Sequence, residues 1–283
     1  MKFGISIFAT DYAIHPSELA REIEARGFES VWLPEHTHIP VNTRSPFPGG
    51  GEIPKQYWHT HDLFVALSFA AAATTRLKVA SGICLLIEHD PIITAKKIAS
   101  LDTLSEGRFL FGIGGGWNAE EMADHGTDFK KRWRILRERV LAMKEIWAKD
   151  EAEFHGEFVS FDKILSYPKP VQKPHPPILM GGFGPRTFDR VVEFSDGWLP
   201  IGLPPADMGG HIRELHSKAE AAGRSPKEIS VTYITRPHVS QKDIETLTEA
   251  GVERIVFSMP VGTRSVVLPA LDKHAALAAD SVR

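Results

Sequence analysis

A glutamate and two histidines occur together in the segment PEHTH, residues 34–38, directly after a short apolar run. Glu35 and His36 are side chains that can exchange protons, because the unperturbed pKa of histidine is about 6.5 and a carboxylate can orient the ring. Acid–base catalysis is therefore the first chemistry that this segment indicates. The alternative is that both residues only position a bound ring by hydrogen bonds.

Two glycine-rich turns are the second candidate feature. The first turn contains Gly114, Gly115, Gly116 and Trp117, and the second contains Gly181, Gly182, Phe183 and Gly184. A turn of this kind that opens a helix presents unpaired backbone N–H groups and the positive end of the helix dipole, which together suit a phosphate. Glycine also serves tight turns and close packing, so each turn alone leaves both interpretations open.

Other kinds of catalytic site find less support. The pairs His36-x-His38 and His59-x-His61 could begin a zinc site, but later strands are not followed by further ligands, and we expect no metal. The sequence has no Gly-x-Ser-x-Gly turn, no Gly-rich phosphate loop ending in lysine and no cysteine nucleophile beside a histidine, so covalent catalysis is not indicated. The glycines, aromatic residues and Glu-His pair that remain suit a planar cofactor with a phosphate tail.

The composition narrows the range of partners. A formal net charge of −3 without a basic cluster argues against nucleic acid and favours a small-molecule substrate. The longest apolar segment, residues 63–73, is shorter than the roughly 20 residues that span a bilayer, so we expect no membrane partner. A single cysteine, Cys84, excludes an intrachain disulfide and is expected in the core, and with no leader pattern at the N-terminus we expect a cytoplasmic protein.

The elements that must position these residues alternate between apolar strands and helices. We expect strands at residues 3–8, 30–34, 77–85, 108–113, 177–181, 197–202, 229–235 and 254–258. Helices are expected between them, for example at residues 16–27, at 61–74 and after Pro91. Eight such units predict an α/β fold of the (β/α)8 TIM-barrel type in one domain over residues 1–283, with an open doubly wound sheet as the alternative. In a barrel the candidate residues, which follow the strands, would meet at one mouth.

Two insertions interrupt the alternation. Residues 39–58, after the second strand, are rich in Pro and Gly and are expected to cover a substrate of low polarity with Tyr57 and Trp58, or to form a dimer contact. The second insertion, residues 117–176 after the fourth strand, contains an amphipathic helix and a small hairpin around Gly156. The apolar face of this helix, which we expect in the core, consists of Trp133, Leu136, Val140, Met143 and Trp147.

Several longer segments carry a family resemblance. They are MKFGIS, GFESVWLPEHTHIP, PFPGGG, RLKVASGICLL, DPIITAKKIASLDTLSEGRFLFGIGGGWNAEE, YPKPVQKPHPPILMGG and FSDGWLP, and they span residues 1 to about 202. In order and spacing the chain resembles the bacterial luciferase-like monooxygenases, and within them the oxidoreductases that depend on coenzyme F420. The last quarter of the chain resembles the family only loosely.

The resemblance implies the layout of a site. The tricyclic ring of a deazaflavin would lie in the barrel mouth, with its phosphate between residues 114–117 and 181–184. A non-proline cis peptide would join Gly82 and Ile83 beneath the ring, and Glu35 and His36 would lie beside the ring and the substrate. Relatives that oxidise glucose 6-phosphate have Glu where this chain has Trp117, so that substrate is not transferred.

Three functions stay open at this point. The first is hydride transfer between coenzyme F420 and a small organic substrate. The second is an FMN-dependent monooxygenase that uses reduced flavin and O2, and the third is a catalytically silent protein that only binds the cofactor. The resemblance also implies a homodimer built on helices near the second and third strands, for which the apolar helix at residues 63–73 is a candidate.

Overall fold

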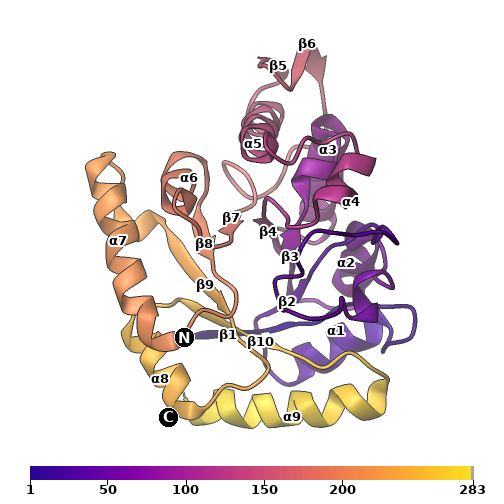
Figure 1. The fold of residues 1–283 in the computed structure, drawn as a ribbon, viewed down its shortest axis with the longest axis vertical. Helices are drawn as coiled ribbons and strands as arrows, with labels where there is room; N and C mark the ends of the chain where they lie inside the picture. Colours follow the sequence, from indigo (N-terminus) through magenta and orange to yellow (C-terminus); the bar gives the residue numbers. More distant parts are fainter. Residues whose placement is uncertain (282–283) are drawn as a thin grey trace.

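The strands of the molecule form a closed barrel, which the computed structural model describes over residues 1–281 (Figure 1). Their order around the barrel is β1-β10-β9-β8-β7-β4-β3-β2, and neighbouring strands run parallel. The barrel strands are β1 (Lys2–Ser6), β2 (Ser30–Leu33), β3 (Lys78–Cys84), β4 (Phe109–Ile113), β7 (Ile178–Gly181), β8 (Gly197–Leu199), β9 (Ser230–Ile234) and β10 (Arg254–Ser258). Because β1 pairs with both β2 and β10, the sheet closes on itself, which confirms the predicted TIM barrel and excludes the open sheet.

Helices surround the barrel and follow its strands. They are α1 (Pro16–Ala25), α2 (Leu63–Ala72), α3 (Pro91–Leu104), α4 (Ala119–Asp124), α5 (Arg132–Ala148), α6 (Thr187–Phe194), α7 (Met208–Ala221), α8 (Gln241–Glu249) and α9 (Arg264–Asp280). Short 3-10 turns occur at η1 (Lys55–Tyr57), η2 (Leu86–Glu88), η3 (Pro205–Asp207) and η4 (Pro226–Glu228). Proline is the first residue of α1 and of α3, where its missing N–H costs no helical hydrogen bond.

The barrel has an inner and an outer apolar layer. The inner cluster fills the barrel below its mouth and consists of Trp32, Ala80, Leu110, Leu179, Leu199, Ile234 and Val256. The indole N–H of Trp32 donates to the Ser30 hydroxyl at 2.8 Å, so this buried polar group is satisfied. The outer cluster packs the strands against the helices and includes Cys84, which is buried as expected. The inner layer therefore makes a solid floor on which a ligand in the mouth can rest.

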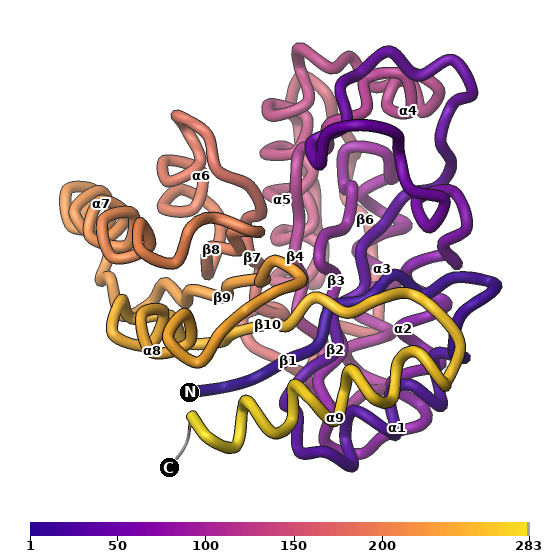
Figure 2. The backbone as a smooth tube through the Cα atoms, turned by 60° about the horizontal axis from the view of Figure 1, so that its bottom comes forward, coloured from indigo at the N-terminus to yellow at the C-terminus, as the bar shows by residue number. Residues whose placement is uncertain are grey.

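The chain closes by packing its last helix against its first. Figure 2 shows α9 running beside α1, with the last turn of α9 near the start of β1. Arg264 of α9 pairs with Glu18 and Glu22 of α1, and Arg26 donates to Asp272 at 2.7 Å. Along residues 1–281, helices long and apolar enough for a bilayer are not found.

The two insertions lie on the mouth side of the barrel strands. Residues 34–62, between β2 and α2, are irregular apart from η1, whereas residues 114–177 contain α4, α5 and the antiparallel hairpin of β5 (Glu151–His155) and β6 (Ser160–Leu165). The hairpin was predicted, and it lies beyond α5 at the edge of the molecule (Figure 1). The strand expected at residues 197–202 ends earlier, at Leu199, because Pro200 has no N–H for the ladder.

Of the five residues of α5 that were predicted to lie in the core, four are buried and one is not. Leu136, Val140, Met143 and Trp147 are buried in the outer core. Trp133 shares their helical spacing but is only partly buried. Its indole instead forms part of the wall of the cavity described next.

Candidate active site

A cavity of about 600 Å³ lies at the carboxyl ends of the barrel strands, and each of the eight strands or the segment after it contributes to its wall. Ten of the predicted residues line it, namely Glu35, His36, Gly82, Ile83, Gly114, Gly115, Gly116, Trp117, Gly181 and Gly182. Two further predicted residues lie outside this lining. Phe183 is half exposed and packs on His211, with 4.4 Å between ring centroids, and the Gly184 N–H donates to the Thr187 hydroxyl at 2.9 Å.

His36 is held on one side and available on the other. Its Nδ1 lies 2.7 Å from Glu121 Oε2, and its backbone carbonyl accepts a hydrogen bond from the Thr60 hydroxyl at 2.7 Å. Its Nε2 has no hydrogen-bond partner among residues 1–281, and the side chain lines the cavity. A carboxyl oxygen on Nδ1 fixes both the orientation and the tautomer of the ring, so that Nε2 is the atom presented to a ligand.

Glu121 is the carboxylate partner of His36, and sequence reasoning did not single it out. It belongs to α4, whose first turn is capped by the Asn118 side chain accepting from the N–H groups of Glu120 and Glu121 at 3.1 Å. The Thr37 N–H donates to the second Glu121 oxygen at 3.1 Å. The pattern Asn-x-x-Glu directly after the glycine turn is the sequence signature of a helix N-terminus, and it was the one available signal for this residue.

Glu35 has a different role from the expected one. It was expected to orient His36, but its carboxylate accepts from the Leu85 N–H at 2.6 Å and lies 2.9 Å from Nε2 of His89. Consecutive residues of an extended segment point in opposite directions, which explains why the two neighbours do not meet. Glu35 therefore holds the end of β3 in place under the cavity, and His36 depends on another carboxylate.

The end of β3 is irregular, as the resemblance implied. The peptide bond between Gly82 and Ile83 is cis, and the register of β3 against β4 shifts between Ser81 and Cys84. The Ile83 side chain fits between the two glycine turns: a Cβ on Gly114 or on Gly181 would lie 2.8 or 2.9 Å from it. Glycine is therefore required on both sides of this apolar platform.

Free backbone N–H groups face the mouth from both glycine turns. Within residues 1–281, hydrogen bonds from the N–H groups of Gly115, Gly116, Gly182 and Phe183 to protein acceptors are not found. Gly182 has a φ of +100°, which side-chain-bearing residues rarely adopt, and a Cβ on Gly115 would lie 2.7 Å from the Trp133 indole. Unpaired amides in this arrangement can bind an anion such as a phosphate.

Three arginines lie beside these turns, and they were missed in the sequence. The Arg190 guanidinium lies 4.0 Å from the centre of the Trp133 ring, and that of Arg132 lies 5.4 Å from it. Burial, together with the positive charges of Arg132 and Arg186, lowers the pKa of Arg190. Among the described residues these three, which we call the arginine group, form no ion pair with a carboxylate. Arg186 and Arg190 lie one helical turn apart directly after the second glycine turn, which was an available signal for these two, whereas Arg132 comes from the start of α5.

Aromatic rings cover the His36 side of the cavity. The ring centroids of Tyr57 lie 5.0 Å from those of His36 and 5.2 Å from those of Phe47, and Phe47 lies 5.6 Å from Trp117. Burial raises the pKa of the Tyr57 phenol, which keeps it protonated and able to donate a hydrogen bond. The expected cover by residues 39–58 is thus present, but Phe47 takes the place expected for Trp58.

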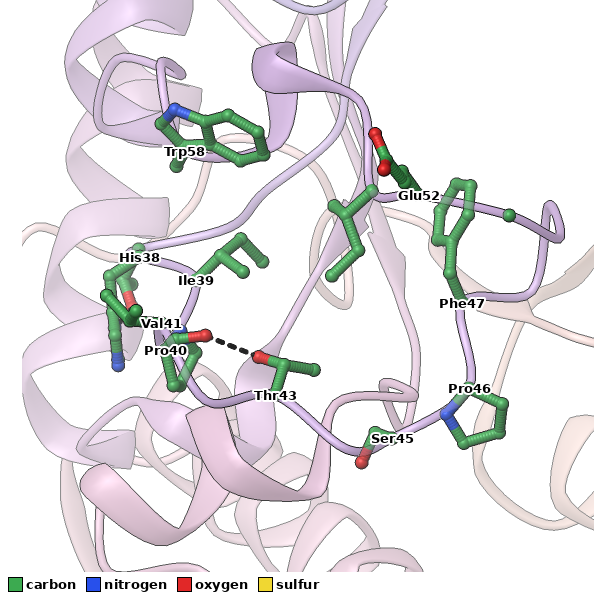
Figure 3. A pocket seen from close by; sticks show the side chains of 13 residues that line it. His38, Ile39, Pro40, Val41, Thr43, Ser45, Pro46, Phe47, Glu52 and Trp58 are labelled. Atoms are coloured by element: carbon green, nitrogen blue, oxygen red, sulfur yellow. Dashed lines mark hydrogen bonds between the residues drawn. The ribbon is translucent and has the colours of Figure 1, made fainter.

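A second cavity, of about 690 Å³, lies within the first insertion itself (Figure 3). Trp58 and Ile39 lie on one side of it and Phe47 and Glu52 on the other, and its wall mixes apolar side chains with polar ones, among them His38, Thr43 and Ser45. The Thr43 hydroxyl donates to the Pro40 carbonyl at 2.6 Å and tightens the turn below. Because Phe47 borders both cavities, this ring is the partition between them.

The histidine pairs considered for zinc have separate partners. His36 contacts Glu121, and His59 lies 2.9 Å from Asp11. Three ligand-type side chains, Glu35, Cys84 and His89, lie closer to one another at the end of β3. Both Glu35 oxygens already accept hydrogen bonds, and burial together with the Glu35 charge raises the pKa of the Cys84 thiol well above its ordinary value. We therefore interpret this group as a hydrogen-bonded support for β3 and assign it no metal.

Comparison with known proteins identifies a family and several relatives of this chain. The family described as luciferase-like monooxygenase matches residues 1–279. An uncharacterised protein of Mycobacterium tuberculosis is 39% identical over 264 residues, which cover 92% of each chain. A 5,10-methylenetetrahydromethanopterin reductase of Methanolobus tindarius is 26% identical over 231 residues, 82% of this chain and 63% of that protein. An FMNH2-dependent dimethylsulfone monooxygenase of Pseudomonas putida is 32% identical over 159 residues, 55% of this chain and 44% of that protein.

Solved structures share the fold. An F420-dependent secondary alcohol dehydrogenase superposes with a TM-score of 0.78 at 18% identity, and the match covers 99% of both chains. A monooxygenase from Streptomyces bottropensis superposes with a TM-score of 0.75 at 20% identity, over 99% of this chain and 98% of that one. Identities this low establish the barrel fold and leave the chemistry to be argued from the residues of the mouth.

Proposed function

This chain belongs to the luciferase-like monooxygenase family, and from that premise we propose that it transfers a hydride between coenzyme F420 and a small organic substrate. The observation that carries the proposal is the orientation of His36: Nδ1 is held by Glu121, and Nε2 is presented to an apolar cavity bordered by free backbone amides. A proton-transfer group beside a site for a phosphate-bearing ring is what hydride chemistry on a polar double bond requires.

The chain's own residues divide the work of binding. The amides of Gly115, Gly116 and Gly182 would hold the phosphate, and Ile83 would support the ring from below. When bound, the deazaflavin supplies a carbon that accepts or gives a hydride. His36 would give or take the accompanying proton at Nε2, while the aromatic cover keeps water from the reacting atoms.

The arginine group supports the deazaflavin over FMN. FMN ends in a single phosphate, whereas the side chain of coenzyme F420 continues beyond its phosphate into glutamate carboxylates. Arg132, Arg186 and Arg190 supply three positive charges at the phosphate end of the cavity, where further anionic groups would be attracted. The charge pattern of this chain therefore matches the longer, more acidic side chain.

The substrate side of the mouth favours an apolar molecule. Tyr57 and Trp117 pack against the His36 ring, Phe47 packs on both of them, and the second cavity begins behind Phe47. A substrate whose reactive carbonyl, imine or alcohol group meets His36 could place an apolar portion against these rings and extend a further portion past Phe47 into the second cavity, whose wall is of mixed polarity. Because the Pseudomonas relative depends on FMNH2, a flavin monooxygenase is the second candidate function. The hydrogen bond between His36 and Glu121 orients a proton-transfer group towards the cavity, which argues against a protein that only binds the cofactor.

We also propose that two copies associate through α2. Val65 and Phe69 of this helix are 56% and 51% exposed, and Ile93 at the start of α3 is 57% exposed, so an apolar surface faces outward there. A homodimer would cover it. Light scattering of the purified chain should give twice the monomer mass, and Val65→Glu with Phe69→Glu should reduce it to one; a monomeric wild type would contradict the proposal.

Turnover assays test the function directly. Reduced coenzyme F420 should be oxidised by members of a panel of enones and imines, or the oxidised coenzyme reduced by secondary alcohols, and His36→Ala should lower the rate by about 10² or more. Consumption of O2 with reduced FMN, without turnover on the deazaflavin, would establish the monooxygenase instead. Binding without turnover on either cofactor would establish the silent protein.

A further inference from the structure

The phenol of Tyr57 is a hydrogen-bond donor without a partner at the wall of the mouth cavity. Tyr57 ends η1 and lines this cavity, and its hydroxyl makes no hydrogen bond within residues 1–281. The hydroxyls of Tyr167 and Tyr233, by contrast, donate to a carboxylate and to a backbone carbonyl. The Tyr57 oxygen is also not among the fully enclosed polar atoms of the described chain, so it is open to the cavity. A free donor in a largely apolar cavity is the kind of group that orients a ligand.

The packing of Tyr57 fixes the place of this donor. Its N–H donates to the Pro54 carbonyl at 3.0 Å, and its ring packs on Phe8 and Phe47, with 4.8 and 5.2 Å between ring centroids. Phe8 follows β1 and Phe47 belongs to the first insertion, so the ring is held between the barrel and its cover. A donor that packing already holds in place loses little conformational freedom when it binds a ligand.

His36 presents its Nε2 to the same cavity as Tyr57. The ring centroids of the two residues lie 5.0 Å apart, at an interplanar angle of 48°. An oxygen that accepts two hydrogen bonds of about 2.8 Å holds its two donors roughly 4.5 Å apart, which is close to this ring separation. The spacing therefore allows one ligand oxygen to contact both the phenol and the imidazole.

Other polar side chains of this wall are engaged elsewhere or lie further from His36. Both Glu35 oxygens accept hydrogen bonds, and the Ser258 hydroxyl donates to a backbone carbonyl at 2.6 Å. The Trp117 indole also packs on the His36 ring, but at a longer centroid distance of 5.8 Å. Tyr57 is therefore the closer of the two donor-bearing rings beside His36, and Trp117 provides a comparison for the test.

We propose that Tyr57 is the second hydrogen-bond donor to the reacting oxygen of the substrate, beside His36. The inference rests on the proposed function and narrows its substrate class to the ketone and alcohol pair. A ketone oxygen has two lone pairs, one for each donor, and an alcohol oxygen can donate to His36 Nε2 while it accepts from Tyr57. An imine nitrogen has a single lone pair, so it can use only one of the two donors. Burial raises the pKa of Tyr57, so the phenol keeps its proton and contributes a hydrogen bond alone.

Turnover by matched variants tests the role of the phenol. Tyr57→Phe keeps the ring and should lower kcat/KM for a ketone about tenfold or more, while kcat/KM for an imine changes less than about twofold and coenzyme affinity is unchanged. The limb of the pH–rate profile that depends on His36 should remain. The control is Tyr12→Phe, which removes a phenol outside the cavity lining and should leave these values unchanged. Equal losses for ketone and imine, a loss in Trp117→Phe without one in Tyr57→Phe, or a wild type that accepts imines and no ketone would overturn the proposal.

Isotope-edited infrared spectroscopy tests the contact without turnover. The probe is acetophenone, with and without a carbon-13 label at its carbonyl, bound to the chain together with oxidised coenzyme F420 or, where that binds more tightly, FMN. Each hydrogen bond lowers the carbonyl stretching frequency, so the band of the bound ketone should move to higher frequency in Tyr57→Phe and stay in place in Tyr12→Phe. An unmoved band in Tyr57→Phe, or a wild type without a band of bound ketone, would overturn the proposal. A moved band in a protein that turns over no substrate would contradict the proposed function alone, so the two failures are distinguishable.

Discussion

Replacement of Glu88 by glutamine should stabilise the folded chain at neutral pH, and by an amount that grows with pH. In the folded state, burial and the negative charges of Glu121 and Glu35 raise the pKa of this carboxyl group to about 9, whereas in the unfolded chain it has its ordinary value of 4.5. Between these two values the unfolded state binds fewer protons than the folded state, so the free energy of unfolding falls as pH rises. The slope is about 1.4 kcal/mol per pH unit.

Glutamine has nearly the same shape as protonated glutamate and does not titrate. Its amide would be as poorly hydrogen-bonded as the acid is, so the two chains should be equally stable at pH 4.5. At pH 7 the variant should be more stable by about 3 kcal/mol, an order-of-magnitude figure that follows from the distance between pH 7 and the ordinary pKa. Few single substitutions stabilise by this much, which makes the sign of the effect informative.

Urea unfolding of both chains at pH 5, 7 and 8.5 measures the difference. Glu29 provides a control with the opposite sign: burial alone would raise its pKa, but Arg254, bonded at 2.7 and 2.9 Å, lowers it to about 2. The contribution of the Glu29 carboxylate to the free energy of unfolding is present above pH 4.5 and is lost as pH falls towards 2. Glu29→Gln should therefore lower the free energy of unfolding by about 3 kcal/mol at pH 7. Parallel pH profiles for wild type and Glu88→Gln would refute the reasoning.

Further substitutions test the mouth. His36→Ala should lower kcat by about 10² or more with little change in Tm, and His36→Asn should lose the limb of the pH–rate profile that the wild type shows; unchanged turnover would withdraw the catalytic role. Gly182→Val should abolish cofactor retention in a chain with normal circular dichroism, because a β-branched residue resists a φ of +100° and would crowd the phosphate; normal affinity would place the phosphate elsewhere. Arg190→Ala should weaken coenzyme F420 binding about tenfold and reduce its salt dependence, and equal weakening of FMN binding would contradict the tail assignment.

The barrel and most of the mouth could be predicted because both follow from local patterns. Parallel strands read as short apolar runs, and barrel geometry brings the residues that follow them to one place. Glu35, His36 and the first glycine turn were located in this way, and the cavity contains them. The expected pairing of Glu35 with His36 was wrong, because neighbours in an extended segment point apart.

The partners of the mouth residues could not be predicted, since they come from insertions whose folding is not periodic. Glu121 and His36 are 85 residues apart in sequence. The capping pattern at Asn118 predicts the start of the short helix that carries Glu121, but it does not predict where this helix packs. Trp133 shares the spacing of core residues, and helical spacing alone does not distinguish a side chain that lines the cavity from one that packs in the core. Glu88 lies in a 3-10 turn whose burial depends on α4 and α5 packing over it.

Titration of the purified chain with oxidised coenzyme F420 and, separately, with FMN tests the central claim most directly. Fluorescence or calorimetry at one fixed salt concentration gives both dissociation constants. The account predicts that coenzyme F420 binds at least tenfold more tightly, a difference of about 1.4 kcal/mol, and that Arg190→Ala removes most of this preference. Tenfold tighter binding of FMN would contradict it.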